Sequence, residues 1–312
     1  MARPSATKSE LGAAARRRPQ RAARRVDACA SASVPRVLAL LALASSVVWG
    51  TSDFVAGMAS KSRPAAAVVG WSQTAALAAM TGLVLVKLPD FPGGTWPLWA
   101  ALAGAAGSSA LVCFYVALST GTMGVVAPIA SLGVVVPIIL GVLGGEQPSA
   151  LALVGMIVAV IGVLLASGPE LSGTSGRRPV LLAALAGVGF GTTFYALDRG
   201  SRVSLIHTLW GMRLTSVLAF ALVALLLRRA GGLTLRDSPI LVVIGLADLL
   251  ANALFAIASS GGYVSVASVL GSLYPVTTAA LAFLVLRERL RPIQFVGGAL
   301  TVLAVLLIAA GG

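Results

Sequence analysis

The chain has 312 residues, of which 58% are hydrophobic and 11% are charged, and its mean hydropathy is +0.96. A soluble domain carries about 25% charged residues, so this chain has too little polar surface to cover a water-soluble protein of its length. Its 23 Lys and Arg residues outnumber its 10 Asp and Glu residues. These basic residues lie in the N-terminal tail and at the ends of apolar runs, without the basic stripe of a nucleic-acid surface. The composition excludes a soluble globular protein and predicts no nucleic-acid partner.

Groups suited to metal binding or nucleophilic catalysis are scarce. Cys29 lies in the tail and Cys113 lies within an apolar run, which offers neither a disulfide framework nor a Cys-rich metal site. His207 is the single histidine, so neither a zinc site nor a Ser-His-Asp triad is expected. We therefore predict no metal site and no cofactor.

The N-terminal tail, residues 1–36, carries nine of the basic residues and has no apolar periodicity. Segments of this composition cannot bury enough apolar surface to fold. We predict that the tail is disordered.

The rest of the chain consists of apolar runs separated by short polar breaks. A helix that crosses ~30 Å of hydrocarbon needs about 20 apolar residues, and ten runs approach that length. The sequence therefore predicts an all-α integral membrane protein with ten transmembrane helices. The predicted spans are residues 37–58, 64–86, 97–119, 122–144, 149–167, 180–198, 203–227, 239–260, 262–286 and 292–310.

The fifth and tenth spans repeat one another. The segment EQPSALALVGMIVAVIGVLLAS from Glu146 aligns without gaps with ERLRPIQFVGGALTVLAVLLIA from Glu288, and both Glu and Gly recur at equal places. Trp49 and Phe190, each followed by Gly, also occupy corresponding places ahead of these glutamates. The repeat divides the chain into a first half at 37–167, a linker at 168–179 and a second half at 180–312.

Each half contains five predicted spans, which is an odd number. The second half must therefore enter the membrane from the side opposite to the first, so the two form an inverted repeat. This architecture recurs among secondary transporters, whose substrate sites lie near the membrane midplane between the halves. The organisation of the chain thus predicts a transporter.

Two stretches resemble a known family. They are VVWGTSDF at 47–54 and SLYPVTTAALAFLVLRERL at 272–290, the latter followed by GGALTVLAVLL. On these motifs the chain resembles the EamA branch of the drug/metabolite transporter superfamily, although Gly133 of the first half stands where Pro275 stands in the second. The resemblance implies ten helices around a central cavity, with the fifth and tenth helices outside it, and both termini in the cytoplasm. It also implies small organic substrates, including amino acids, other metabolites and cationic drugs.

Few ionisable side chains fall inside the predicted spans, where each one is unfavourable. Asp248 lies near the middle of the eighth span, with Asn252 one turn further on, and Arg213 lies near the middle of the seventh. Asp248 is either a substrate or proton site, or the partner of Arg213 in a structural ion pair; pairing would disfavour proton coupling through it. Asp53 of the first span faces either the cavity or the membrane interface.

Aromatic residues on different spans are further candidates for the substrate cavity. Trp49, Tyr115, Phe190 and Tyr274 have side chains able to stack on rings or cations. The alternative is that such residues form belts at the membrane interface, an interpretation we prefer for Trp96.

Prolines and loop glutamates have structural interpretations. Pro128, Pro137 and Pro275 fall inside the fourth and ninth spans, where they remove helix hydrogen bonds and are candidate kinks or hinges. Glu146 and Glu288 lie in short loops before helix starts, so we interpret them as structural caps of those helices, not as a catalytic pair.

The predicted function is secondary transport of small metabolites, amino acids or drugs by alternating access, in the export direction. The expected surroundings are membrane lipid, with the protein in the cell membrane and protons as a candidate coupling ion. The alternative is an intramembrane enzyme acting on a lipid-linked substrate, which would need converging catalytic groups near one membrane face. The scarcity of His, Asp and Glu disfavours it, and no feature of the sequence marks an oligomer interface.

Overall fold

The structure is a computed structural model that describes residues 36–87, 90–120, 126, 129–166, 177–228, 232, 234–286 and 292–311. Within these ranges the chain is helical and contains no strand, which confirms the all-α fold class. Most of the N-terminal tail, Pro128 and Glu288 lie outside the described residues. The first helix begins at Arg36, at the end of the predicted tail.

The described helices follow the order of the predicted spans. Five of them are long and apolar enough to cross a membrane, and α7 is long enough to contain two spans. The elements are the first helix Arg36–Ser60, α2 Ala65–Lys87, α3 Trp96–Thr120, η1 Leu132–Val134, α5 Val135–Leu143, α6 Ala150–Ala166, α7 Arg177–Leu227, η2 Leu235–Asp237, α8 Ser238–Ser260, α9 Val264–Gly271, α10 Tyr274–Leu286 and α11 Pro292–Gly311.

The long helix α7 is two helices joined at a sharp break. Ser204 has a φ of −159° and a ψ of 113°, an extended conformation inside an otherwise helical segment. The arms 177–203 and 205–227 correspond to the sixth and seventh predicted spans. Ser204 alone has non-helical backbone angles between the two arms, so no loop separates them.

The fourth and ninth spans, at 122–144 and 262–286, each contain a local change of helix geometry, and these are the two spans in which prolines were predicted to form kinks. The fourth changes to the 3-10 helix η1 before α5, and the ninth stops after α9 and restarts as α10. Pro137 and Pro275 lie in the first turns of α5 and α10. Proline is tolerated there because the N–H groups of a first turn have no partner within the helix. Each proline follows a local change of helix geometry, where a kink is expected, and the hinge role of these residues stays a prediction.

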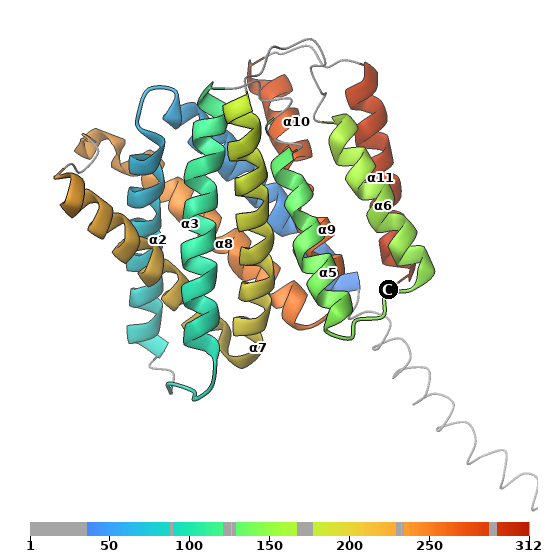
Figure 1. The fold of residues 1–312 in the computed structure, drawn as a ribbon, viewed down its shortest axis with the longest axis horizontal. Helices are drawn as coiled ribbons and strands as arrows, with labels where there is room; N and C mark the ends of the chain where they lie inside the picture. The colour runs from blue at the N-terminus through green and yellow to red at the C-terminus, as the bar shows by residue number, and fades with distance from the viewer. Residues whose placement is uncertain are drawn as a thin grey trace, which may run out of the picture.

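The helices form one bundle (Figure 1), in which α6 and α11 pack against each other at one edge. The outer surface carries many exposed aliphatic side chains, such as Leu85, Leu185 and Leu306 at 65%, 61% and 62% exposure. Water-soluble monomers rarely expose large contiguous apolar patches. The surface is therefore suited to lipid, and the chain is a membrane protein.

Glycines set the closest contacts between the two halves. A Cβ at Gly50 of the first helix would fall 2.5 Å from the carbonyl oxygen of Tyr274, at the start of α10. Gly191 occupies the equivalent place in the second half, and a Cβ there would clash with the carbonyl oxygen of Gly133 in η1. Small residues allow such close backbone approach between membrane helices. The opening helix of each half therefore packs against the interrupted helix of the other.

A second pair of glycine contacts also joins the first half to the second. A Cβ at Gly104 of α3 would clash with the carbonyl oxygen of Met212 in α7, and one at Gly245 of α8 would clash with that of Ser72 in α2. Both contacts join the first half to the second. The two halves are thus joined by two pairs of close glycine contacts.

We predict that Gly50→Ala destabilises the protein by about 1–3 kcal/mol, because the added methyl overpacks a backbone contact that cannot retreat without separating two helices. Gly57→Ala is the matched control in the same helix, since nothing lies within 4 Å of a Cβ at that position. Denaturant unfolding of both variants in lipid nanodiscs measures the difference. Equal unfolding midpoints would show that the close approach does not constrain the fold.

Candidate functional site

The side-chain carboxylate of Asp248 on α8 is saturated with hydrogen bonds. Its Oδ1 accepts from Trp49 Nε1 at 3.1 Å and from Asn252 Nδ2 at 3.0 Å. Its Oδ2 accepts from Arg213 Nη1 at 2.8 Å and from Gln73 Nε2 at 3.1 Å. A buried carboxylate needs such compensation because removing it from water is strongly unfavourable.

Four helical segments supply this network. Trp49 comes from the first helix, Gln73 from α2 and Arg213 from the second arm of α7, while Asn252 follows Asp248 by one turn on α8. The (i, i+4) spacing brings Asn252 onto the same face as Asp248, where its Nδ2 also donates to the Asp248 carbonyl oxygen at 2.7 Å. The network therefore joins both halves of the chain.

Asp53 forms a second polar contact nearby. The Tyr115 hydroxyl donates to Asp53 Oδ1 at 2.9 Å, which joins the first helix to α3. The interfacial alternative for Asp53 rested on the basic residues of the following loop. Arg63 of that loop instead pairs with Asp237 of η2, whose pKa is lowered to about 2 by hydrogen bonds from the Thr234 backbone N–H and from Arg63.

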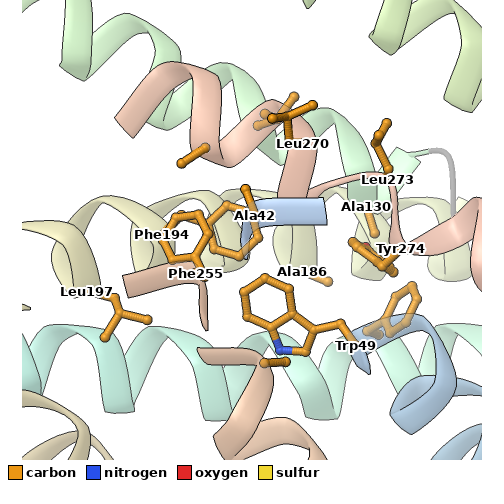
Figure 2. Packing of buried hydrophobic residues seen from close by; sticks show 14 of the residues in the cluster. Ala42, Trp49, Ala130, Ala186, Phe194, Leu197, Phe255, Leu270, Leu273 and Tyr274 are labelled. Carbon is orange, nitrogen blue, oxygen red and sulfur yellow. The ribbon is translucent and has the colours of Figure 1, made fainter. Parts of the chain in front are cut away.

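An aromatic cluster stands beside the polar network. The Trp49 ring stacks on Phe194 with a centroid separation of 5.2 Å, and Phe194 stacks on Phe255 at 4.7 Å. Figure 2 shows Trp49 among these rings, with Tyr274 close to it. Phe190 and Tyr274 meet edge-to-face at 6.5 Å. Such pairs fix ring orientation as well as burying apolar area.

These groups line a partly open cavity of about 50 Å³ between the two halves. A water molecule needs roughly 10–15 Å³ on this measure, so the space holds a few waters or a fragment of similar size. Residues of both halves line it: Trp49, Asp53, Gln73, Gly107, Ser108, Leu111, Phe190, Thr193, Phe194, Met212, Arg213, Ser216, Asp248, Asn252 and Tyr274.

The structure brings together most of the cavity residues expected from sequence. All of them line the cavity except Tyr115, which reaches it through its hydrogen bond to Asp53. The sequence reasoning missed Gln73 and Phe194. The signal for Gln73 was a buried amide in the middle of an apolar span, whereas Phe194 carried no signal that separates it from a lipid-facing Phe.

Glu146 caps a helix other than the one predicted. Its carboxylate accepts hydrogen bonds from the backbone N–H groups of Val264 and Ser265 and from the Ser265 hydroxyl, all at the start of α9. The helix that follows Glu146 in the chain is capped by Ser149, whose Oγ accepts from Ala152 N at 3.1 Å. The expectation that Glu146 caps its own helix was wrong because the loop folds across onto the second half.

A second cavity of about 240 Å³ adjoins this cap at one end of the bundle. Asp198 and Arg202 of α7 line it and pair at 3.0 Å, and Arg202 Nη2 also donates to the carbonyl oxygens of Ser259 and Gly262 at 3.1 Å. A cation at the end of α8 complements the unpaired carbonyls there. These contacts fix the connection between α8 and α9.

His207 is packed among aromatic residues away from the central cavity. It is 1% exposed and lies 4.6 Å from the Phe91 ring and 5.2 Å from the Trp96 ring. Trp96 itself is buried in this cluster at 8% exposure, so our preference for an interfacial belt at Trp96 was wrong. In the part of the chain that the structure describes, no group of three or more His, Cys, Asp or Glu residues could hold a metal ion.

The chain is similar to known proteins in sequence and in fold. It matches the family model of the EamA-like transporter family over residues 37–168 and 177–310. One solved crystal structure, described only as that of a protein, matches with a TM-score of 0.72 and 18% identity, over 87% of this chain and 96% of that chain. At this identity the likeness shows a shared fold alone. A search of curated proteins finds none that matches.

We predict that Arg213→Gln and Asp248→Asn each destabilise the protein by about 3–5 kcal/mol, because each leaves the opposite charge buried without its partner. The double variant Arg213→Gln/Asp248→Asn should lose much less than the sum of the two. A double-mutant cycle of unfolding free energies in nanodiscs measures the coupling. Additive losses would show that the pair is not energetically coupled.

We also predict that Glu146→Gln lowers the unfolding free energy by about 1–2 kcal/mol, because the amide retains one acceptor oxygen and loses the charge that favours a helix N-terminus. Asp90→Asn, an exposed loop change, is the control and should stay within about 0.5 kcal/mol of the parent. The measurement is the midpoint of thermal unfolding in detergent. Equal shifts for the two variants would count against the cap across the halves.

Proposed function

This chain belongs to the EamA-like transporter family, and from that premise we propose that it exports small metabolites, amino acids or drugs as a secondary transporter. Members of the family are transporters, so the chain acts on small molecules in a lipid surrounding. We propose likewise that the chain is not an enzyme.

The observation that carries the proposal is the cavity shared by the two halves. Both halves line it, and it lies beside Tyr274, at the start of the restarted helix α10. Interrupted helices at the interface of inverted repeats are the usual site of substrate binding in such carriers. Ion pairs and aromatic walls in one cavity also suit a polar ligand with an apolar body.

Alternating access is the mechanism that we propose, and the size of this cavity and the changes of geometry in the fourth and ninth spans support it. A space of about 50 Å³ is too small for a typical metabolite, so a substrate has to enter through a rearrangement of the halves. The change from 3-10 to α-helix between η1 and α5, and the two residues between α9 and α10, are positions at which these segments could bend.

Proton coupling is proposed at Asp53, not at Asp248. The Asp248 carboxylate already accepts hydrogen bonds from four side-chain donors, one of which is the Arg213 guanidinium. Asp53 lines the same cavity and receives a hydrogen bond from Tyr115 alone among the described residues. We further propose that the protein lies in the cell membrane with both termini in the cytoplasm.

The test is substrate loss from proteoliposomes under an imposed proton gradient, with a panel of amino acids and cationic dyes. We expect gradient-driven flux of at least one class, and about a tenfold or larger loss of that flux in Asp53→Asn. Asp90→Asn is the matched control, because that carboxylate is exposed in a loop. Flux that does not change with the gradient or with either substitution would contradict proton antiport and would indicate an exchanger or a facilitator.

A further inference from the structure

The two cavities follow one another along the first arm of α7. Phe190 and Phe194 line the central cavity. Further along the same arm, Asp198 and Arg202 line the cavity of about 240 Å³ at the end of the bundle, which we call the end cavity. These four residues recur at intervals of four, so they share one face of the helix. Phe194 and Asp198 are therefore separated by about 6 Å along the helix axis.

Helix α8 runs between the same two cavities. Asn252 lines the central cavity, and the Ser259 carbonyl oxygen accepts a hydrogen bond from Arg202, which lines the end cavity. Phe255 lies between Asn252 and Ser259 on this helix and is fully buried. The sequence of α8 thus places Phe255 at a height between the two cavities.

Helix α9 covers this interval as well. Its first residue, Val264, lines the end cavity and donates its backbone N–H to Glu146. Its last residue, Gly271, lies behind the rings, since a Cβ there would be 3.3 Å from the Phe255 side chain and 3.5 Å from that of Trp49. A bend in the two residues between α9 and α10 would therefore move the surface against which Phe255 packs.

Stacked aromatic rings occupy the interval between the cavities. The Phe194 and Phe255 rings stack with a centroid separation of 4.7 Å, and Trp49 packs on both at 5.2 and 5.8 Å (Figure 2). Apolar constrictions exclude water and polar solutes, and they open or close a path through a membrane protein by small displacements. The stacked rings are suited to such a barrier.

The end cavity opens to the surface beyond these rings. Arg202 and Tyr263 line it, and both are exposed. A polar solute at this end of the bundle could therefore enter the end cavity and would then meet the rings before it reached the central cavity.

We propose that the stacked rings of Phe194 and Phe255 close the central cavity toward the end cavity, and that the end cavity is the part of the transport path beyond them. The inference rests on the proposed transport function, because it takes the central cavity as the place where the substrate is held. Movement of α9 separates the rings, since Gly271 packs behind Phe255.

Thiol labelling from one membrane face tests the proposal. The background is Cys29→Ser/Cys113→Ser, which removes both cysteines of the chain. Leu111→Cys then places a thiol at the central cavity, and Tyr263→Cys places one at the end cavity in a separate variant. A small membrane-impermeant methanethiosulfonate is added to sealed right-side-out and inside-out vesicles of an expression host. Tyr263→Cys identifies the preparation whose outer face carries the end cavity.

In that preparation we expect the thiol of Leu111→Cys to react about tenfold or more slowly than that of Tyr263→Cys, because it is reached only while the rings are apart. Adding Phe194→Ala/Phe255→Ala should accelerate its labelling from this face by about tenfold or more. Phe194→Ala alone is a milder change and should give a smaller acceleration.

Phe114→Ala is the matched control. Phe114 is also a buried ring, but it packs on Phe190, one turn of α7 further from the end cavity than Phe194. This variant should keep the slow labelling of the thiol of Leu111→Cys. Size-exclusion profiles check that each variant is folded, and labelling in denaturant checks that each thiol is present.

An unchanged labelling rate in both ring variants, or equal acceleration by Phe114→Ala, would overturn the proposal. Fast labelling of the central thiol with both rings in place would overturn it too. If labelling follows the expectation while the proteoliposome assay shows no flux of any substrate, the transport function fails, and with it the assignment of the end cavity to a transport path. Flux together with unchanged labelling would retain transport and reject the rings as the barrier.

Discussion

The Asp248 carboxylate accepts side-chain hydrogen bonds from the first helix, α2, α7 and its own helix, and the centre of the bundle is organised around it. A charge at this depth is tolerated only while its compensation is complete. That requirement orients the Trp49 ring, which in turn stacks on Phe194 and so fixes the aromatic wall. It also pairs with Arg213 through Nη1, and Arg213 is one of the residues that line the cavity. One polar interaction thereby sets the positions of both the rings and the cation.

Much of the fold could be predicted from the sequence, because a membrane requires helices of a minimum length and their apolar runs are easy to find. The exact form of the irregular stretches in the fourth and ninth spans could not be predicted, although prolines marked both spans. Ser272 and Leu273 separate α9 from α10 inside an apolar run, and hydropathy does not distinguish an interrupted helix from a continuous one. The proline that starts α10 was visible but supports either a kink or a restart.

The site was predictable where depth alone brings groups together. Arg213 and Asp248 lie at the middles of neighbouring spans, so their contact follows from length. Gln73 was overlooked because an amide is less conspicuous than a charge, although its buried donor and acceptor need partners equally. The target of Glu146 lies on α9 in the other half, and no local pattern predicts that a loop will cap so distant a helix. Contacts of this kind between the two halves could not be predicted from the sequence.

The reciprocal glycine contacts bear on how the protein is made. Gly50 of the first half closes against the start of α10, and Gly191 of the second closes against η1, so neither half covers its own interrupted helix. During synthesis the first half enters the bilayer with Gln73 and Trp49 unmatched, and it has to wait for Arg213 and Asp248 to emerge from the ribosome. The two halves are therefore interlocked partners in assembly, not consecutive domains. A half synthesised alone lacks the contacts that cover its irregular helix. Two separate polypeptides, each carrying one half, together contain both sides of these contacts.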